Sequence, residues 1–255
     1  MQYFLGIDIG TYESKGVLTD KEGNIIASAT HPHKMLLPQP GWAEHRPEED
    51  WWNDFVKITK KILKASKINP GDISCIATSA IGPCMLPVSY EGDPLMNAVL
   101  YGVDTRAENE IRELNEEVGE EKILQNCGNA LTSQSVGPKI LWLKKNCPEI
   151  FKRAGKILSS TSFLVQKLTG ESVIDHYTAA NFTPLYDIKN LKWTDALTKN
   201  IIEIERLPKL MWTTEIAGYV SKAASKETGL ATGIPVTVGT IDAAAEAISV
   251  GVCSA

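Results

Sequence analysis

Two aspartates near opposite ends of the chain most strongly constrain its fold. Asp8 lies in the segment Gly6–Gly10, at the end of the apolar run that opens the sequence. Asp242 follows the apolar run Ile234–Thr240, which contains Gly239. Glycine lacks Cβ and so permits close approach of the backbone to a ligand or to another strand. Both aspartates are therefore expected at the ends of buried strands, beside small-residue turns.

The first third of the chain predicts a meander followed by a helix and a further strand. Apolar runs at Tyr3–Ile9, Ser14–Thr19 and Ile25–Thr30 are joined by short Gly-containing segments, which is typical of antiparallel hairpins. Asp54–Ser66 has apolar residues near one helical face and lysines on the other. Ile73–Thr78 follows that helix as a buried strand, which we expect to be parallel.

The remaining elements alternate in type. Met85–Val88 and Val99–Tyr101 are expected to extend the same sheet. Helices are expected at Asp104–Val118, Lys139–Asn146, Glu149–Ala154, Ser162–Leu168, Thr194–Ile202, just before Gly229, and at Asp242–Val250. Strands that alternate with helices after a meander predict a layered α/β domain. By analogy, this order matches the ribonuclease-H-like fold of the actin-like ATPases.

Composition excludes several classes of protein. The 255 residues are 43% hydrophobic and 22% charged, which is ordinary for a globular protein of one large or two small domains. A net charge of −5 provides no basic field for nucleic acid, and no apolar run approaches the roughly 18–20 residues that span a bilayer. We expect no signal peptide, reduced thiols and a cytoplasmic location. The cysteines are scattered and form no Cys-x-x-Cys pair: Cys75, Cys84, Cys127, Cys147 and Cys253.

The N-terminal motif, Gly6–Gly16, has the groups that a phosphate-binding turn needs. Backbone amides at Gly10 and Thr11 could point outward, and Thr11 and Ser14 add hydroxyl donors. Lys15 adds a cation that could reach a transferring phosphate. Asp8 could hold Mg²⁺ through water, since Mg²⁺ usually binds one or two carboxylates and keeps several waters. The alternative, an ordinary hairpin turn with its usual Asp and Gly, stays open.

The C-terminal motif, Gly239–Ala245, also allows two interpretations. Asp242 starts the alanine-rich run Ala243–Val250, and aspartate is favoured at helix N-termini because it accepts hydrogen bonds from free amides. Alternatively, Asp242 is a general base that takes the proton of a substrate hydroxyl while its oxygen attacks a phosphate. The two motifs together, in this order, favour phosphate transfer.

Five segments in order resemble the N-terminal domain of the FGGY carbohydrate kinases, with the xylulokinase branch most similar. They are Gly6–Thr11, Gly41–Glu48, Asp104–Ala107, Leu168–Gly170 and Gly239–Asp242. The resemblance covers essentially all of residues 1–255. It implies two ribonuclease-H-like domains around a cleft, with ATP and Mg²⁺ as cofactors. This chain would be the first domain, and a C-terminal nucleotide-binding domain would lie outside it.

The resemblance also implies roles for individual residues. Asp8 matches the Mg²⁺-linked aspartate, and Gly10, Thr11 and Lys15 match phosphate-contacting positions. Asp242 matches the catalytic base, which also contacts substrate, and Asp104 matches an aspartate that faces the sugar.

Two departures from the family pattern concern phosphate and substrate. Tyr12 and Glu13 stand where many members have Thr, Ser or Gly. Gly82, Pro83 and Cys84 occupy a substrate-facing stretch where related kinases have polar side chains. Without those groups, recognition of a larger substrate or recognition by other loops stays open.

The expected function is ATP-dependent phosphorylation of a sugar hydroxyl. A ketopentose such as xylulose is favoured, and a related polyol or sugar acid is the alternative substrate. Two other functions stay open: a non-catalytic sugar-binding or regulatory protein, and a sugar-independent actin-like ATPase. Expected partners are the sugar, the second domain and a possible homodimer, but no nucleic acid and no membrane. Trp42 could stack on a sugar ring or pack in the core, and the four histidines lack the spacing of a metal site.

Overall fold

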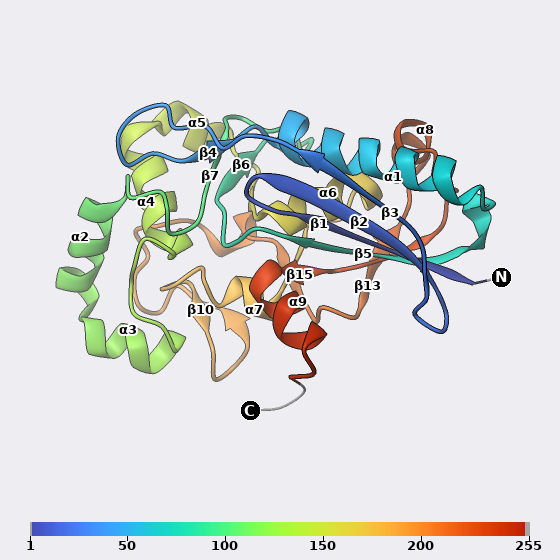
Figure 1. Cartoon of the computed structure of the whole chain (residues 1–255). Coiled ribbons are helices and arrows are strands. Elements are labelled where there is room, and N and C mark those ends of the chain that lie inside the picture. Colours follow the sequence, from blue (N-terminus) through green and yellow to red (C-terminus); the bar gives the residue numbers. More distant parts are fainter. Residues whose placement is uncertain (1, 253–255) are drawn as a thin grey trace.

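A mixed sheet forms the centre of the computed structural model, which describes residues 2–252 (Figure 1). The predicted meander is confirmed: β1 (Tyr3–Ile9), β2 (Glu13–Asp20) and β3 (Ile25–Pro32) are antiparallel neighbours. The next strand, β5 (Ile73–Ala80), runs parallel to β1, as expected. The sheet continues through β14 (Pro235–Thr237) to β13 (Ile216–Tyr219). It is therefore built from both ends of the chain.

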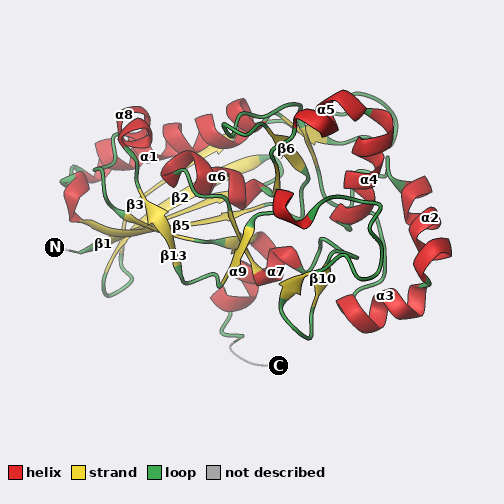
Figure 2. Cartoon of the chain, turned by 180° about the vertical axis from the view of Figure 1, so that it is seen from behind, coloured by secondary structure: helices red, strands yellow, loops and turns green. Residues whose placement is uncertain are grey.

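The two faces of the sheet are covered differently. Helices α1 (Asn53–Ser66), α6 (Ser160–Thr169) and α8 (Lys222–Thr228) lie on one face, and α9 (Asp242–Ser249) lies on the other (Figures 1 and 2). The contact with α1 is close at Gly16, where a Cβ would lie 2.4 Å from a methyl group of Ile58. Ile7 faces the same way as Gly16. Because side chains alternate along a strand, Asp8 and Lys15 point to the α9 side.

The middle of the chain forms a second apolar core beside the sheet. Its helices are α2 (Glu108–Val118), α3 (Glu120–Cys127), α4 (Val136–Asn146), α5 (Pro148–Arg153) and α7 (His176–Ala179). Figure 1 shows α2 and α3 at the end of the molecule remote from the N-terminus. Among the described residues, four two-stranded sheets lie outside the central sheet: β4 (Glu44–His45) with β7 (Ala98–Val99), β6 (Leu86–Val88) with β8 (Lys156–Leu158), β9 (Val173–Asp175) with β12 (Lys209–Met211), and β10 (Tyr186–Asp187) with β11 (Lys192–Trp193).

Two sequence predictions of secondary structure are wrong. The strands expected at 85–88 and 99–101 do not extend the central sheet, because β6 and β7 pair with β8 and β4 instead. Residues 194–202 contain no helix. There the Thr198 hydroxyl donates to Glu117 at 2.9 Å, and Ile201 and Ile202 are buried in the second core. Tertiary contacts therefore override the local helical pattern.

The strand expected at Ile234–Thr240 is interrupted. Val238 and Gly239 separate β14 from β15 (Thr240–Ile241), which pairs parallel with β5. Gly239 has φ +71°, and a Cβ there would lie 2.3 Å from the Thr78 carbonyl oxygen. Only glycine fits this conformation and this distance. The break sets the position from which α9 starts.

Short helical turns occur at three places between the longer elements. A π-helical turn spans Pro47–Trp52, and 3₁₀ turns span Pro70–Asp72 and Ile204–Arg206.

Cysteines 75, 84, 127 and 147 are free thiols, and Cys253 lies outside the described residues. None of the helices between residues 2 and 252 combines the length and apolar character needed to cross a bilayer.

Candidate functional site

An open cavity of about 710 Å³ lies on the α9 side of the central sheet. Strands β1, β2, β3 and β5 supply part of its lining, and residues around the start of α9 supply another part. The polar and small residues that matter most here are Asp8, Lys15, Ser79, Gly239 and Thr240. The cavity thus brings the two aspartate motifs from opposite ends of the chain to one place.

Asp8 lies across from Ser79 in the parallel pair of β1 and β5. The Ser79 hydroxyl donates to Asp8 Oδ1. Asp8 is half-buried, and within residues 2–252 its second oxygen has no hydrogen-bond donor. One oriented carboxylate with a free oxygen suits a cation, because Mg²⁺ commonly binds one or two carboxylates and fills its other positions with water and phosphate.

Lys15 is directly across from Asp8 in the antiparallel register of β1 and β2. It is exposed, and it forms no ion pair among the described residues. Its ammonium is therefore available to a phosphate at the cavity.

Asp242 is the first residue of α9 and follows β15, which is across from the end of β5. Asp8 and Asp242 therefore flank the same end of β5. The backbone amide of Ala243 donates to Asp242 Oδ1 at 2.8 Å. Burial raises the pKa of the Asp242 carboxyl most, and the charges of Asp8 and Glu246 raise it further, while the Ala243 amide lowers it. A carboxylate that binds a proton more tightly than usual is better suited to act as a general base.

The turn between β1 and β2 presents two free amides. The Gly10 amide donates to the Glu13 carbonyl at 3.1 Å and closes the turn, so it is not directed at a ligand. Between residues 2 and 252, the amides of Thr11 and Tyr12 have no backbone or side-chain acceptor. The structure thus shifts the available donors one residue along from the predicted Gly10 and Thr11. Gly10 is needed for the turn itself, because a Cβ there would lie 2.6 Å from the Glu13 carbonyl oxygen.

Ser14 and Asp104 do not line this cavity, so the structure does not bring these two predicted site residues together with Asp8 and Lys15. Ser14 is buried on the α1 face, where its hydroxyl donates to Asp54 at 2.9 Å. Alternation along β2 puts it opposite to Lys15. The buried Asp104 carboxylate accepts from Arg106 Nη2 at 2.7 Å and from the Ala43 amide at 2.7 Å. These contacts fix Asp104 within its own loop, and its predicted contact with a sugar stays a prediction.

The stretch Gly82–Cys84 is only partly beside the site. Gly82 packs against Ile241, where an added Cβ would lie 2.4 Å from a methyl group, so this position adjoins Asp242. Cys84 is fully buried, and burial raises the pKa of its thiol to about 12. The Cys84 thiol therefore offers no substrate contact in this structure.

A match to a protein-family model shows which family this chain belongs to. The model of the FGGY family of carbohydrate kinases, N-terminal domain, matches residues 3–249. This chain belongs to the FGGY family. Among curated relatives, the glycerol kinase of Thermococcus gammatolerans is 33% identical over 227 residues, 87% of this chain and 45% of that protein. The xylulose kinase of Lactococcus lactis is 29% identical over 257 residues, 98% of this chain and 50% of that protein.

Solved structures of FGGY kinases share the fold. The xylulose kinase from Rhodospirillum rubrum matches with a TM-score of 0.93 at 27% identity, covering 99% of this chain and 51% of that one. The glycerol kinase from Plasmodium falciparum, solved with ADP, matches with a TM-score of 0.86 at 27% identity. The match covers 97% of this chain and 50% of that one. The predicted ribonuclease-H-like α/β fold class is confirmed. This chain spans about half the length of the curated relatives it matches.

Several residues of this FGGY domain that support the site escaped sequence reasoning. The buried Lys139 donates to the carbonyls of Leu100 and Tyr101, the latter at 2.9 Å. Burial lowers the pKa of Lys139 to about 8. The Tyr101 hydroxyl lies 3.1 Å from Thr11 Oγ1, so Lys139 supports a loop that contacts the turn. A lysine placed among the apolar residues of the first half of α4 was the available signal.

Trp42 is half-buried and lies over the Arg106 guanidinium at 3.9 Å, edge-on to Trp142. Trp42 also lines a second cavity of about 420 Å³, with Pro38, Gly41 and others. Packing therefore accounts for one face of the indole. The predicted sugar-stacking role stays a prediction.

Proposed function

We propose that this chain is the first domain of an ATP-dependent sugar or polyol kinase with Asp242 as its general base. The observation that carries the proposal is that Asp8 and Lys15 line one cavity together with Gly239 and Thr240, which directly precede Ile241 and Asp242, and that the nearby charge of Asp8 adds to burial in raising the pKa of Asp242. A phosphate, a cation and a hydroxyl need these three kinds of group at close quarters. Family membership supports the reaction class.

The transfer step follows from these groups. Asp242 takes the proton from a substrate hydroxyl as that oxygen forms a bond to the γ-phosphorus of ATP, and the bond from this phosphorus to the β,γ-bridging oxygen breaks. Lys15 and the amides of Thr11 and Tyr12 stabilise the negative charge on the transferring phosphoryl group. The products are a sugar phosphate and ADP.

Asp8 would hold Mg²⁺ at this site. Its free oxygen fits the ion, and a cation there would also offset the repulsion between Asp8 and Asp242. When bound with the nucleotide, Mg²⁺ supplies charge neutralisation at the phosphate oxygens.

The second half of the protein would complete the site. Because this chain spans about half of its relatives, we propose that a following domain supplies the adenosine site. Closure of the two domains would exclude water and limit ATP hydrolysis.

The proposed substrate is a ketopentose such as xylulose, with a polyol or sugar acid as the alternative. Relatives named xylulose kinase cover 98–99% of this chain, which supports the ketopentose. Relatives named glycerol kinase are similarly identical and support the polyol. Gly82 and Pro83 bring no polar side chains beside Asp242, so other loops would recognise the hydroxyls.

ADP release tests the proposal. The protein at its natural length is assayed with MgATP over a panel of pentuloses, hexuloses, polyols and gluconate. We expect release that depends on one class of sugar. Sugar binding without ADP release would favour the non-catalytic alternative. ATP hydrolysis that no sugar stimulates would favour the actin-like ATPase.

A further inference from the structure

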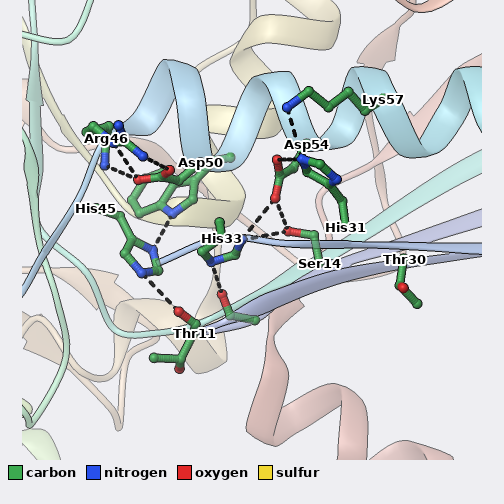
Figure 3. Close-up of polar contacts among 12 residues, drawn as sticks. Thr11, Ser14, Thr30, His31, His33, His45, Arg46, Asp50, Asp54 and Lys57 are labelled. Carbon is green, nitrogen blue, oxygen red and sulfur yellow. Dashed lines mark hydrogen bonds and ion pairs between the residues drawn. The ribbon is translucent and has the colours of Figure 1, made fainter. Parts of the chain in front are cut away.

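Two histidines hold the turn between β1 and β2 from its inner side (Figure 3). His33 Nε2 lies 3.1 Å from the Gly10 carbonyl oxygen, and His45 Nε2 lies 3.1 Å from the Thr11 carbonyl oxygen. The rings contact each other edge to face, with centroids 4.9 Å apart. Two consecutive carbonyls of the turn are thus fixed by two neighbouring imidazoles from different segments of the chain.

Planarity of the peptide bond turns this contact into an orientation of the amides. In a trans peptide the carbonyl of one residue points opposite to the N–H of the next. The Gly10 carbonyl therefore sets the direction of the Thr11 amide, and the Thr11 carbonyl sets that of the Tyr12 amide. These are the two amides of the turn that have no acceptor within residues 2–252. Holding the carbonyls inward keeps both N–H groups directed outward.

The ring of His45 is fixed in one tautomer. The indole N–H of Trp51 donates to His45 Nδ1 at 3.0 Å, so Nδ1 is the acceptor and the hydrogen is on Nε2. That hydrogen is donated to the Thr11 carbonyl. His45 is fully buried, and burial lowers its pKa to about 4, with the nearby His33 lowering it and Asp50 raising it. The neutral ring is therefore a permanent donor to the turn.

The ring of His33 is fixed by a buried carboxylate. His33 Nδ1 lies 2.9 Å from Asp54 Oδ2, which also accepts the Ser14 hydroxyl at 2.9 Å. His31 Nε2 faces the other oxygen of Asp54 at 3.5 Å. Asp54 stands in the first turn of α1, so this helix positions the ring. Both ring nitrogens of His33 therefore face oxygen atoms, Nδ1 that of Asp54 and Nε2 that of the Gly10 carbonyl.

We propose that His33 and His45 are positioning residues for phosphoryl transfer: they hold the carbonyls of Gly10 and Thr11 so that the amides of Thr11 and Tyr12 meet the phosphates of ATP. The proposal rests on the proposed function, because it assigns a ligand to these two amides. It also gives the buried Ser14 a role, since Ser14 helps to orient Asp54 and through it His33.

Substitutions at His45 separate this role from simple packing. Phe keeps the aromatic shape but leaves the Thr11 carbonyl without a donor. Gln can accept from Trp51 and donate to Thr11 through one amide. In the protein at its natural length we expect His45→Phe to raise the KM for ATP by about tenfold, the effect of one lost buried hydrogen bond, with the KM for the sugar nearly unchanged. His45→Gln should restore most of the ATP affinity.

His31→Gln is the matched control, because His31 does not contact the turn and faces Asp54 Oδ1 at 3.5 Å, whereas His33 and Ser14 both contact Oδ2. It should leave both KM values near those of the unmodified protein. Equal rises in the KM of ATP and of sugar in His45→Phe, or no rescue by Gln, would overturn the proposal.

Two further measurements keep the turn proposal separate from the kinase proposal. If no sugar is phosphorylated, the proposed function fails, and the dissociation constant of MgATP in the same variants still decides the role of the turn. A protein that does not bind MgATP would contradict both proposals. Should His45→Phe not fold, ¹⁵N NMR of the histidine rings in the unmodified protein decides. We expect hydrogen on Nε2 and none on Nδ1 of His45 at neutral pH, and the opposite tautomer would overturn the proposal.

Discussion

At the residue scale, Asp242 combines a partly buried carboxylate with two like charges nearby. Burial is the largest cause of its raised pKa, followed on the raising side by Asp8 and Glu246. Glu246 is one helical turn further along α9, and it is exposed. The protonation of Asp242 is therefore adjustable by a residue that need not contact substrate.

The pH dependence of turnover should report this carboxylate. A general base works only when deprotonated, so kcat/KM should fall as the pH drops through the pKa of Asp242, above the usual range of aspartate. Glu246→Gln removes one negative charge, which lowers that pKa and should move the acid limb to lower pH. The measurement is kcat/KM against pH for both proteins. An acid limb that does not move would exclude Asp242 as its source.

The buried His45 should make stability depend on acid. Its native pKa of about 4 is below the ordinary histidine value of 6.5, so between these values the unfolded state binds more protons. Stability is present above about pH 6.5 and falls as the pH drops towards 4, by about 2 kcal/mol between pH 7 and pH 5.

Urea denaturation at the two pH values measures this loss. His45→Gln has no titratable side chain at position 45. Between pH 7 and pH 5 this variant should therefore lose about 2 kcal/mol less stability than the unmodified protein. An equal loss in both proteins would contradict the assignment to His45.

At the scale of elements, the break between β14 and β15 positions the catalytic candidate. Gly239 permits β15 to return to β5 after the break, and α9 starts immediately after β15. Its positive φ and its 2.3 Å approach to the Thr78 carbonyl both require glycine.

Gly239→Ala should therefore destabilise the protein by about 2–4 kcal/mol, because a backbone carbonyl cannot move aside cheaply. Gly233→Ala is the matched control, since Gly233 has φ +87° but nothing within 4 Å of an added Cβ. It should cost only about 1–2 kcal/mol, from the backbone conformation alone. Denaturation midpoints compare the two. Equal losses of stability in Gly239→Ala and Gly233→Ala would contradict this explanation, because they would show that the close approach to Thr78 adds no cost.

Local patterns predicted the meander, β5, α1 and the strand-to-helix passage at Asp242, because each has a clear period and marked ends. They failed where pairing is decided at a distance. The strands predicted at 85–88 and 99–101 are expected in the central sheet, but β6 and β7 pair elsewhere. The helical pattern at 194–202 yields to contacts with α2 and the second core.

Within the site, strand alternation separates Ser14 from Lys15, and the sequence contained that information. Residue type alone nevertheless suggested both as phosphate donors. The Gly10 amide closes the turn, and residue type alone does not show which amide of a turn is engaged in this way. The roles of His33 and His45 depend on Asp54 and Trp51, which come from segments that the fold brings together.

At the scale of the whole molecule, the site is an open face of a domain. Ala245 and Ile248 of α9 line the cavity. Helix α9 lies on the sheet face opposite α1 (Figure 1). Since FGGY relatives are about twice as long as this chain, we expect the remaining half to face this cavity and bind the nucleotide. Asp242, Lys15 and the turn amides would then act on groups held by both halves.

The most direct test of this account follows phosphate from ATP to sugar by ³¹P NMR. The protein at its natural length is compared with Asp242→Asn, using the sugar that best stimulates ADP release. We predict one new phosphomonoester signal that grows in step with ADP, and a rate about 10²–10⁴ lower in the variant, the usual contribution of general base catalysis. An unchanged rate in Asp242→Asn, or ADP formed without a sugar phosphate, would contradict the account.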